Sequence, residues 1–151
     1  MSKSSFSCAL CAQDGGSLVW RSDALRVVHV EQDGFPGYYR VVWNAHVAEF
    51  SALSDAERAE CMDAVVCVER ALIAHLAPTK VNLAALGNQV PHLHWHVIAR
   101  FDWDTHFPNP LWGEAQRPRD HDQEAAVREK LEPVNAQIRA YLAKGEAPQG
   151  G

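Results

Sequence analysis

Residues 92–98 read HLHWHVI, and this alternation of histidine with apolar residues constrains the fold more than any other part of the chain. Successive side chains of an extended strand point to opposite faces of a sheet. The three imidazoles should therefore line one face, while Leu93, Trp95 and Val97 bury the other. A row of titratable rings costs stability unless it binds something. The pattern predicts a strand whose polar face binds a metal or a phosphate, or forms a covalent phosphoryl intermediate.

A metal centre built from these three histidines alone has poor geometry. On an extended strand they spread along about 13 Å, whereas zinc binds each histidine nitrogen at ~2.0–2.1 Å. A non-haem iron site requires two histidines and a carboxylate, and the next acidic residue along the chain is Asp102. The remaining interpretation is a histidine nucleophile whose neighbours bind phosphate.

The rest of the chain predicts four more strands and one long helix. Ser54 and Glu57 form a capping box, a hydroxyl at the N-cap and a carboxylate three residues on, and apolar residues follow at helical spacing until Pro78. The predicted strands are 18–20, 25–30, 38–43, 80–85 and 91–100. Because strands and helices do not alternate singly, the fold class is α+β, an antiparallel sheet of about five strands packed with one long helix.

Beyond the last strand, residues 102–118 show no period and are expected to form a loop. Residues 120–144 are helix-prone with an interruption at Pro133, and residues 145–151 are expected to fray. We therefore expect a domain over residues 1–113 and a C-terminal helical extension and tail over residues 114–151.

Charge and composition exclude some functions. The net charge of −5 offers no clustered basic face for nucleic acid. No stretch has the pattern of a signal peptide or a membrane span. The expectation is a cytoplasmic protein that binds neither nucleic acid nor membranes.

Residues 92–98 also match a known family pattern, His-apolar-His-apolar-His-apolar-apolar. Residues 87–91 (GNQVP) are similar to the family's Gly-Gln-Ser/Thr-Val segment, and Asn82 stands where the family has an asparagine. From about Cys8 to Trp112 the chain thus resembles the histidine triad (HIT) family, as a divergent subgroup with an N-terminal CxxC. The resemblance implies the HIT-like fold, a homodimer, and an enzyme that attacks the α-phosphate of a purine nucleotide.

By this resemblance His94 is the nucleophile. A neutral imidazole attacks phosphorus, and water can cleave the resulting phosphoramidate, so one difficult displacement becomes two easier ones. One ring nitrogen must then carry no proton, and in the family the other nitrogen donates to a backbone carbonyl. His96, on the same face, would donate to a phosphate oxygen and ease departure of the leaving group. This chemistry requires no catalytic metal.

Three residues depart from the family pattern. Asn88 stands where glutamine is usual, and Gln89 stands where serine or threonine is usual. Tyr38 follows the Pro-Gly turn, where members often have a histidine that supports the triad. Asn88 and Gln89 stay candidate phosphate ligands, because backbone N–H groups at these positions can still serve.

Two more residues are candidate nucleotide ligands with an alternative structural role. Asn82 would orient the active-site loop or contact phosphate, or it is a strand-end residue. Glu31 would bind the ribose hydroxyls, or it is an exposed charge in a turn. Trp112 resembles the family's C-terminal Trp segment near the active site, or is a loop aromatic pinned on the domain.

The pair Cys8 and Cys11 indicates half a zinc site or a redox motif. A redox motif needs a helix that opens at the first cysteine, whereas this pair leads into an Asp-Gly-Gly turn, so a zinc site is favoured. By the resemblance, His46 and His92 would complete a structural Cys₂His₂ zinc site. The alternative is that the cysteines are free thiols and His92 bonds within the triad.

The leading hypothesis is a hydrolase of dinucleoside polyphosphates, such as diadenosine tetraphosphate, or of nucleoside phosphoramidates, acting through a nucleotidyl-His94 intermediate. Three alternatives stay open. The chain is a nucleotidyltransferase, a nucleotide-binding regulator with little turnover, or an interaction module that depends on zinc.

Overall fold

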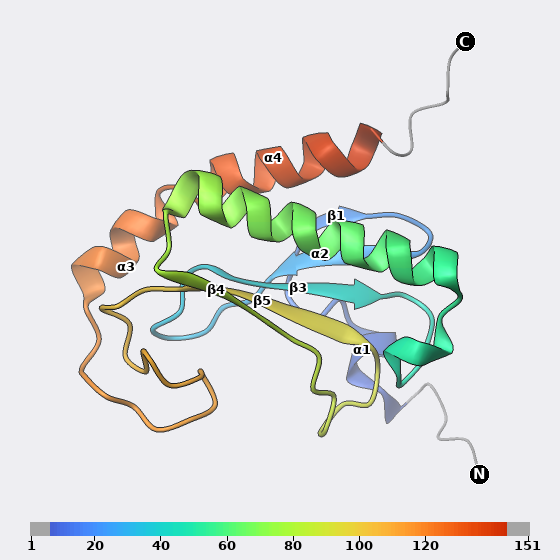
Figure 1. Ribbon diagram of the computed structural model, residues 1–151, viewed down its shortest axis with the longest axis horizontal. Helices are drawn as coiled ribbons and strands as arrows, with labels where there is room; N and C mark the ends of the chain where they lie inside the picture. Colours follow the sequence, from blue (N-terminus) through green and yellow to red (C-terminus); the bar gives the residue numbers. More distant parts are fainter. Residues whose placement is uncertain (1–6, 145–151) are drawn as a thin grey trace.

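The computed structural model describes residues 7–144, and the predicted α+β fold is confirmed. Five strands form one antiparallel sheet in the order β1-β2-β3-β5-β4 (Figure 1). The strands are β1 (Ser17–Arg21), β2 (Leu25–His29), β3 (Tyr38–Trp43), β4 (Lys80–Ala84) and β5 (His94–Arg100). The helices are α1 (Ala9–Ala12), α2 (Asp55–Leu76), α3 (His121–Arg128) and α4 (Leu131–Lys144), with a 3₁₀ turn, η2 (Phe50–Ala52), before α2.

The long helix α2 begins at the predicted capping box. The Glu57 backbone N–H donates to the Ser54 hydroxyl at 3.1 Å, and the Ser54 N–H donates to the Glu57 carboxylate at 2.8 Å. Two of the N–H groups that a helix start leaves unpaired are thereby satisfied. The helix ends at Leu76, where Ala77 adopts a left-handed conformation, with φ of 45°, before Pro78.

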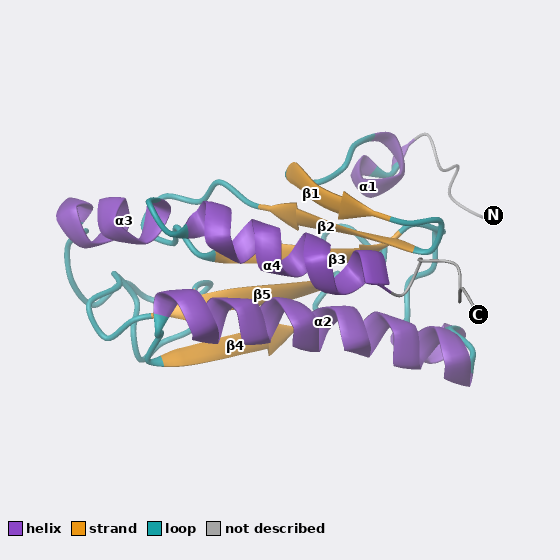
Figure 2. Cartoon of the chain, turned by 90° about the horizontal axis from the view of Figure 1, so that it is seen from above, coloured by secondary structure: helices purple, strands orange, loops and turns teal. Residues whose placement is uncertain are grey.

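Helices α2 and α4 lie side by side on one face of the sheet (Figure 2). The main core lies between this helical layer and the sheet, and it includes Val97 and Ala99 of β5. Val134 and Ile138 of α4 are fully buried in the same core. The C-terminal helices therefore share the core of the sheet domain, and the boundary at residue 113 stays a prediction.

Three local differences separate the structure from the sequence-based expectation. Strand β5 begins at His94 instead of Pro91, because the backbone N–H groups of His92 and Leu93 donate to the loop carbonyls of Val90 and Val47. The cysteine pair opens a helix, α1, directly after Cys8.

The third difference concerns the C-terminal helices. The helical segment is interrupted at residues 129–130, between α3 and α4. Pro133 lies inside the first turn of α4. Proline is tolerated there because its missing N–H would have no partner within the helix.

No helix within residues 7–144 is long and apolar enough to cross a membrane. The tail 145–151, expected to fray, lies outside the described residues.

The second face of the sheet carries the polar side of β5. Helix α1 covers one end of this face, where Cys8 and Leu10 pack against Val28 and Val42. The loop after β5 returns over the other end (Figure 1), where Leu111 packs against a cluster that includes Ile98. The triad therefore lies between two covering segments from opposite ends of the chain.

Candidate active site and metal centre

His94 and His96 occupy the polar face of β5, as the alternation predicts. Their ring centres lie 4.8 Å apart, and their side chains are 8% and 5% exposed. Between them Trp95 points to the other face, where it packs against Phe50 of η2. Strand geometry alone thus puts two imidazoles side by side and holds them from behind by the core.

The orientation of His94 is fixed by the backbone. Its Nδ1–H donates to the carbonyl oxygen of His92 at 2.6 Å, which leaves Nε2 without a proton and with a free electron pair. Burial lowers the pKa of His94, the hydrogen bond to His92 opposes this, and the positive charge of Arg40 lowers it further. His94 is therefore held as a neutral imidazole with Nε2 available for attack.

His96 is held by the phenol of Tyr38. The Tyr38 hydroxyl lies 2.6 Å from His96 Nδ1, and with the phenol as donor the proton of the neutral ring sits on Nε2. Burial lowers the pKa of His96 to about 4, and electrostatic repulsion from His94 and Arg40 contributes to the decrease. A neutral His96 with a proton on Nε2 is suited to donate to an oxygen that gains negative charge.

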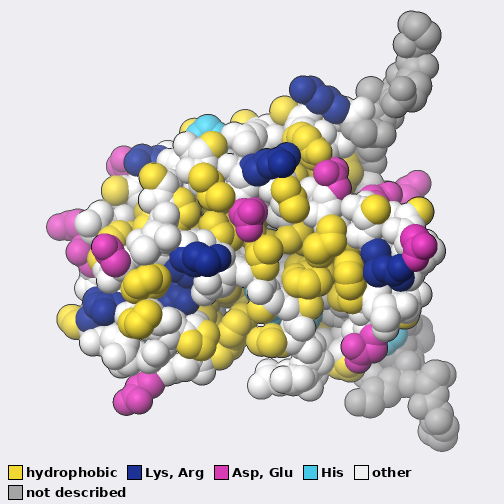
Figure 3. Space-filling model, in the orientation of Figure 1, with side chains coloured by type: hydrophobic (Ala, Val, Ile, Leu, Met, Phe, Trp, Pro, Cys, Tyr) yellow, Lys and Arg dark blue, Asp and Glu magenta, His cyan; other side chains and the backbone are white. Residues whose placement is uncertain are grey.

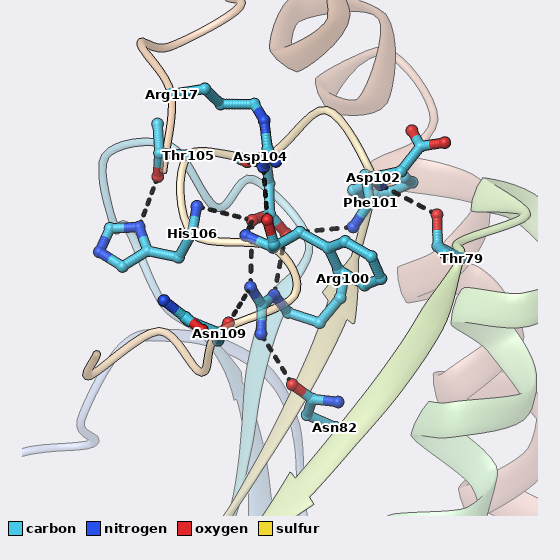
Figure 4. A network of polar contacts seen from close by, with 11 residues as sticks. Thr79, Asn82, Arg100, Phe101, Asp102, Asp104, Thr105, His106, Asn109 and Arg117 are labelled. Carbon is cyan, nitrogen blue, oxygen red and sulfur yellow. Dashed lines mark hydrogen bonds and ion pairs between the residues drawn. The ribbon is translucent and has the colours of Figure 1, made fainter. Parts of the chain in front are cut away.

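The ring of Trp112 lies edge-on to His96, with 5.0 Å between ring centres, and is 49% exposed. Its position depends on the loop 101–118, which a buried ion pair organises (Figure 4). Arg100 donates to both carboxylate oxygens of Asp104, at 2.8 and 3.1 Å, and to the carbonyl of Asn109. Asp104 also accepts the backbone N–H groups of Phe101, His106 and Phe107.

The four residues predicted to bind phosphate or nucleoside do not all lie next to the triad. Asn82 lies on β4 beside Ile98, and its Oδ1 accepts from Arg100 Nη1 at 2.9 Å (Figure 4). Asn88 and Gln89 are exposed in the loop between β4 and β5. Glu31 is exposed after β2 and pairs with Arg128 at 3.2 Å. The binding roles of these four residues stay predictions.

Sequence reasoning missed Arg40, the cation that faces the triad. Arg40 lies two residues after Tyr38 in β3, so both side chains lie on the same face of the sheet. Arg40 is also the register partner of His96. Because side chains two residues apart in a strand share a face, placing Tyr38 beside the triad would also have placed Arg40 there. Asp104 gives no such signal, because it follows β5 in an irregular loop.

The four predicted metal ligands come together at the other end of the triad. Cys8, Cys11, His46 and His92 offer ligand atoms that all lie within 4.8 Å of one another. His92 Nδ1 lies 3.5 Å from each sulfur, and His46 Nδ1 lies 3.3 Å from Cys11 Sγ and 3.3 Å from His92 Nδ1.

These separations match a tetrahedral zinc site. With Zn–S and Zn–N bonds of ~2.3 and ~2.05 Å, a tetrahedron separates sulfur from nitrogen by about 3.6 Å and two nitrogens by about 3.3 Å. His92 Nε2–H donates to the Trp43 carbonyl at 2.6 Å, so the unprotonated nitrogen, Nδ1, faces the sulfurs. A metal-binding histidine commonly anchors its second nitrogen in this way. The donor set therefore fits zinc.

Comparison of the sequence with family models matches the HIT domain over residues 13–103, more than half of the chain. The chain belongs to the HIT family. No curated protein matches the sequence.

Solved structures of other HIT proteins share the fold. A histidine triad protein from Bradyrhizobium japonicum is 28% identical, with a TM-score of 0.68 over 83% of this chain and 92% of that one. Another from Marinobacter aquaeolei is 26% identical, with a TM-score of 0.66 over 85% and 94%. A Zn-bound histidine triad family protein from Mycobacterium smegmatis is 18% identical, with a TM-score of 0.62 over 94% and 99%. At that identity the last comparison shows the fold alone.

Proposed function

We propose that this HIT protein is a nucleotidyl hydrolase that cleaves dinucleoside polyphosphates or nucleoside phosphoramidates at the α-phosphate. The observation that carries the proposal is the 2.6 Å hydrogen bond from His94 Nδ1 to the His92 carbonyl, since it leaves Nε2 free to attack. A buried histidine with a merely structural role would normally have both nitrogens bonded.

In the first step, the His94 Nε2 electron pair forms a bond to the α-phosphorus. The bond from phosphorus to the leaving oxygen or nitrogen breaks, and the leaving atom keeps the electron pair. His96 donates a hydrogen bond from Nε2 to that atom, which offsets the developing negative charge, and solvent water supplies any proton that the leaving atom takes up. The product of this step is a nucleotidyl-His94 intermediate.

In the second step, water attacks the same phosphorus. The bond between phosphorus and Nε2 breaks, its electrons return to His94, and the proton released by the attacking water passes to solvent. A nucleoside monophosphate leaves, and His94 is again a neutral imidazole with Nε2 free to attack.

The test is AMP release from diadenosine tetraphosphate and from adenosine phosphoramidate. Wild type is compared with His94→Ala, and His75→Ala serves as the control because His75 bonds Gln137 on the helical side of the sheet. We expect turnover in wild type and the control but not in His94→Ala. Intact-mass spectrometry of quenched wild type should show an adenylyl adduct.

Other results would select the alternatives. AMP binding without turnover in wild type would indicate a regulator, and transfer of the adenylyl group to an added phosphate acceptor would indicate a transferase. Equal activity in wild type and His94→Ala would contradict the proposal.

We further propose that Cys8, Cys11, His46 and His92 bind one structural zinc ion. The proposal is supported by the tetrahedral separations of their ligand atoms and by the Zn-bound relative from Mycobacterium smegmatis. Elemental analysis of the purified protein should find one equivalent of zinc. Less than a tenth of an equivalent after growth with added zinc would contradict it.

We also propose that the protein is a homodimer, as the family resemblance implies. Hydrophobic side chains gather on the face that carries α2 and the edge strand β4 (Figure 3), and Ile73 and Leu83 of these elements are 53% and 42% exposed. Edge strands with exposed apolar residues are prone to pair with another chain. Light scattering should give twice the mass of one chain for wild type, and Leu83→Asp should shift it toward a single chain.

A further inference from the structure

Within residues 7–144, three buried or half-buried arginines reach onto the triad side of the sheet, each from a different strand. Arg26 lies on β2, Arg40 on β3 and Arg100 on β5. Their hydrogen bonding separates them into two kinds, because a guanidinium offers five N–H donors that burial makes costly to leave unpaired.

Arg26 and Arg100 each make four hydrogen bonds, through all three guanidinium nitrogens. Arg26 is 3% exposed and donates to three backbone carbonyls and to the Asn44 side chain, at 2.7–3.0 Å. Arg100 is 2% exposed and uses Nε, Nη1 and Nη2 on Asp104, Asn82 and Asn109. Both guanidinium groups are explained by the fold that they hold together.

Arg40 is not saturated. It is half-buried, and Nη1 donates to the Gly15 carbonyl at 2.9 Å, whereas Nε is buried without a hydrogen-bond partner. Within residues 7–144 it forms no ion pair with a carboxylate. A half-buried guanidinium with an unpartnered Nε and no counter-charge is suited to bind an anion.

Such an anion would lie at the triad. Arg40 is paired in register with His96, and side chains opposite each other on neighbouring strands have Cβ atoms about 5 Å apart. Its guanidinium lies 5.7 Å from the centre of the Tyr38 ring, whose hydroxyl contacts His96. Its charge also lowers the pKa of both His94 and His96, which places it within electrostatic range of both rings.

We propose that Arg40 is a phosphate-binding residue, and that the anion which completes its site is the phosphate of the nucleotide attacked by His94. This inference rests on the proposed function and adds the group that holds the substrate's charge. A guanidinium can donate two parallel N–H bonds to phosphate oxygens, and such charge-assisted bonds are about twice as strong as neutral ones. Arg40 would also offset negative charge that builds on the phosphate during attack.

The experiment measures binding of three probes by calorimetry: AMP, adenosine and inorganic pyrophosphate. Arg40→Gln should weaken AMP and pyrophosphate about tenfold or more, while the affinity for adenosine changes less than twofold, because only the first two carry phosphate charge. Arg40→Lys should recover part of the loss, since it keeps the charge but not the planar fork.

The control is Arg139→Gln, which removes the same charge from a residue paired with Glu132 on α4, and which should leave all three affinities unchanged. Unchanged AMP and pyrophosphate affinity in Arg40→Gln would overturn the proposal. An equal loss for adenosine would also overturn it, because that result indicates a purely structural tie to Gly15.

Two further outcomes separate this proposal from the proposed function. Arg40-dependent pyrophosphate binding without AMP binding would refute the nucleotide substrate and support the anion site. Failure of wild type to bind any of the three probes would overturn the anion site. If Arg40→Gln does not fold, Arg40→Lys decides, with AMP weakened at least threefold and adenosine unchanged as the supporting result.

Discussion

The two faces of strand β5 are built on different principles. On one face Trp95, Val97 and Ala99 enter a core where each apolar side chain has many neighbours. On the other face His94, His96 and Arg100 each depend on one or a few specific polar partners. A packed face loses stability in increments, whereas a face of specific hydrogen bonds fails at the residue that is changed. Substitutions on the two faces should therefore differ in kind as well as in size.

The largest effect is expected from Asp104→Ala on the polar face. It would leave Arg100 buried with no counter-charge and unpair three backbone N–H groups, so we expect a loss of about 3–5 kcal/mol in the free energy of unfolding. Urea unfolding measures this loss. The control is Asp102→Ala, two residues away and exposed, with an expected change within about 0.5 kcal/mol. Equal effects of the two would show that the ion pair does not hold the loop.

Removing one ligand of the proposed zinc site should have the next largest effect. Cys11→Ser replaces an exposed ligand of the proposed zinc site and should lower the unfolding free energy by about 3 kcal/mol, a fraction of what structural zinc gives small domains. For a chain of this size the melting temperature would fall by roughly 6–12 °C. Zinc content should fall in parallel, and turnover below the melting temperature should persist. Cys67→Ala, inside the core, should keep its zinc, and a zinc-free Cys67→Ala would rule out the assigned ligands.

The pH dependence of stability should expose the buried His96. The unfolded chain takes up a proton at this residue near pH 6.5, but the folded protein only near pH 4. Protons therefore favour the unfolded chain between these two pH values. The contribution of neutral His96 to the free energy of unfolding is complete above pH 6.5 and is lost as pH falls toward 4. Between pH 6.5 and 4.5 the loss from His96 should be about 2 kcal/mol.

This pH effect is isolated by comparing wild type with His96→Gln. The variant cannot titrate at this position, so its melting temperature should fall less steeply between pH 7 and pH 4.5. Parallel curves for the two proteins would mean that the pKa of His96 is not lowered by burial.

On the apolar face, Val97→Ala should cost about 2 kcal/mol, because it leaves a small cavity where the side chain was fully buried. The turnover number at low temperature should stay within about twofold of wild type. A loss of turnover greater than tenfold with a native melting curve would show that the two faces are not separable.

The smallest effect is expected from a pair of hydroxyl deletions. Tyr38→Phe removes the partner of His96 and should reduce the turnover number about tenfold, with a change in unfolding free energy of only ~1 kcal/mol. Tyr39→Phe removes a hydroxyl that donates to Asn135 on the helical side, and should leave turnover unchanged. If both variants turned over alike, the Tyr38 phenol would have no role in orienting His96.

The sequence predicted what depends on local rules. The strand that carries the triad, the capping box of α2 and the proline after it follow from alternation, hydrogen-bond chemistry and backbone restriction, each confined to a few residues. The His94 orientation came from the family resemblance and is confirmed by the bond to the His92 carbonyl. The clustering of Cys8, Cys11, His46 and His92 was also expected from the resemblance and is confirmed as a geometry that fits a metal.

The rest depends on irregular loop geometry, on pairing between strands, or on a helix too short to give a pattern. The chain turns at Asp104 without any periodicity, so nothing local indicates that its carboxylate caps the loop and neutralises Arg100. Likewise, a single arginine in an apolar strand is unremarkable until the neighbouring strand places His96 opposite it. The helix at Cys8 was also missed, because its single turn is too short to give a helical pattern.

His92 serves two neighbours with two different parts of itself. Its imidazole faces the cysteines, while its main-chain carbonyl orients His94. Any amino acid brings a carbonyl to this position, but only a few bring a metal ligand. A substitution at position 92 can therefore remove one ligand of the proposed metal site and still keep His94 in its orientation. The metal-binding group depends on which side chain stands at position 92, whereas the orientation of His94 depends only on the backbone there.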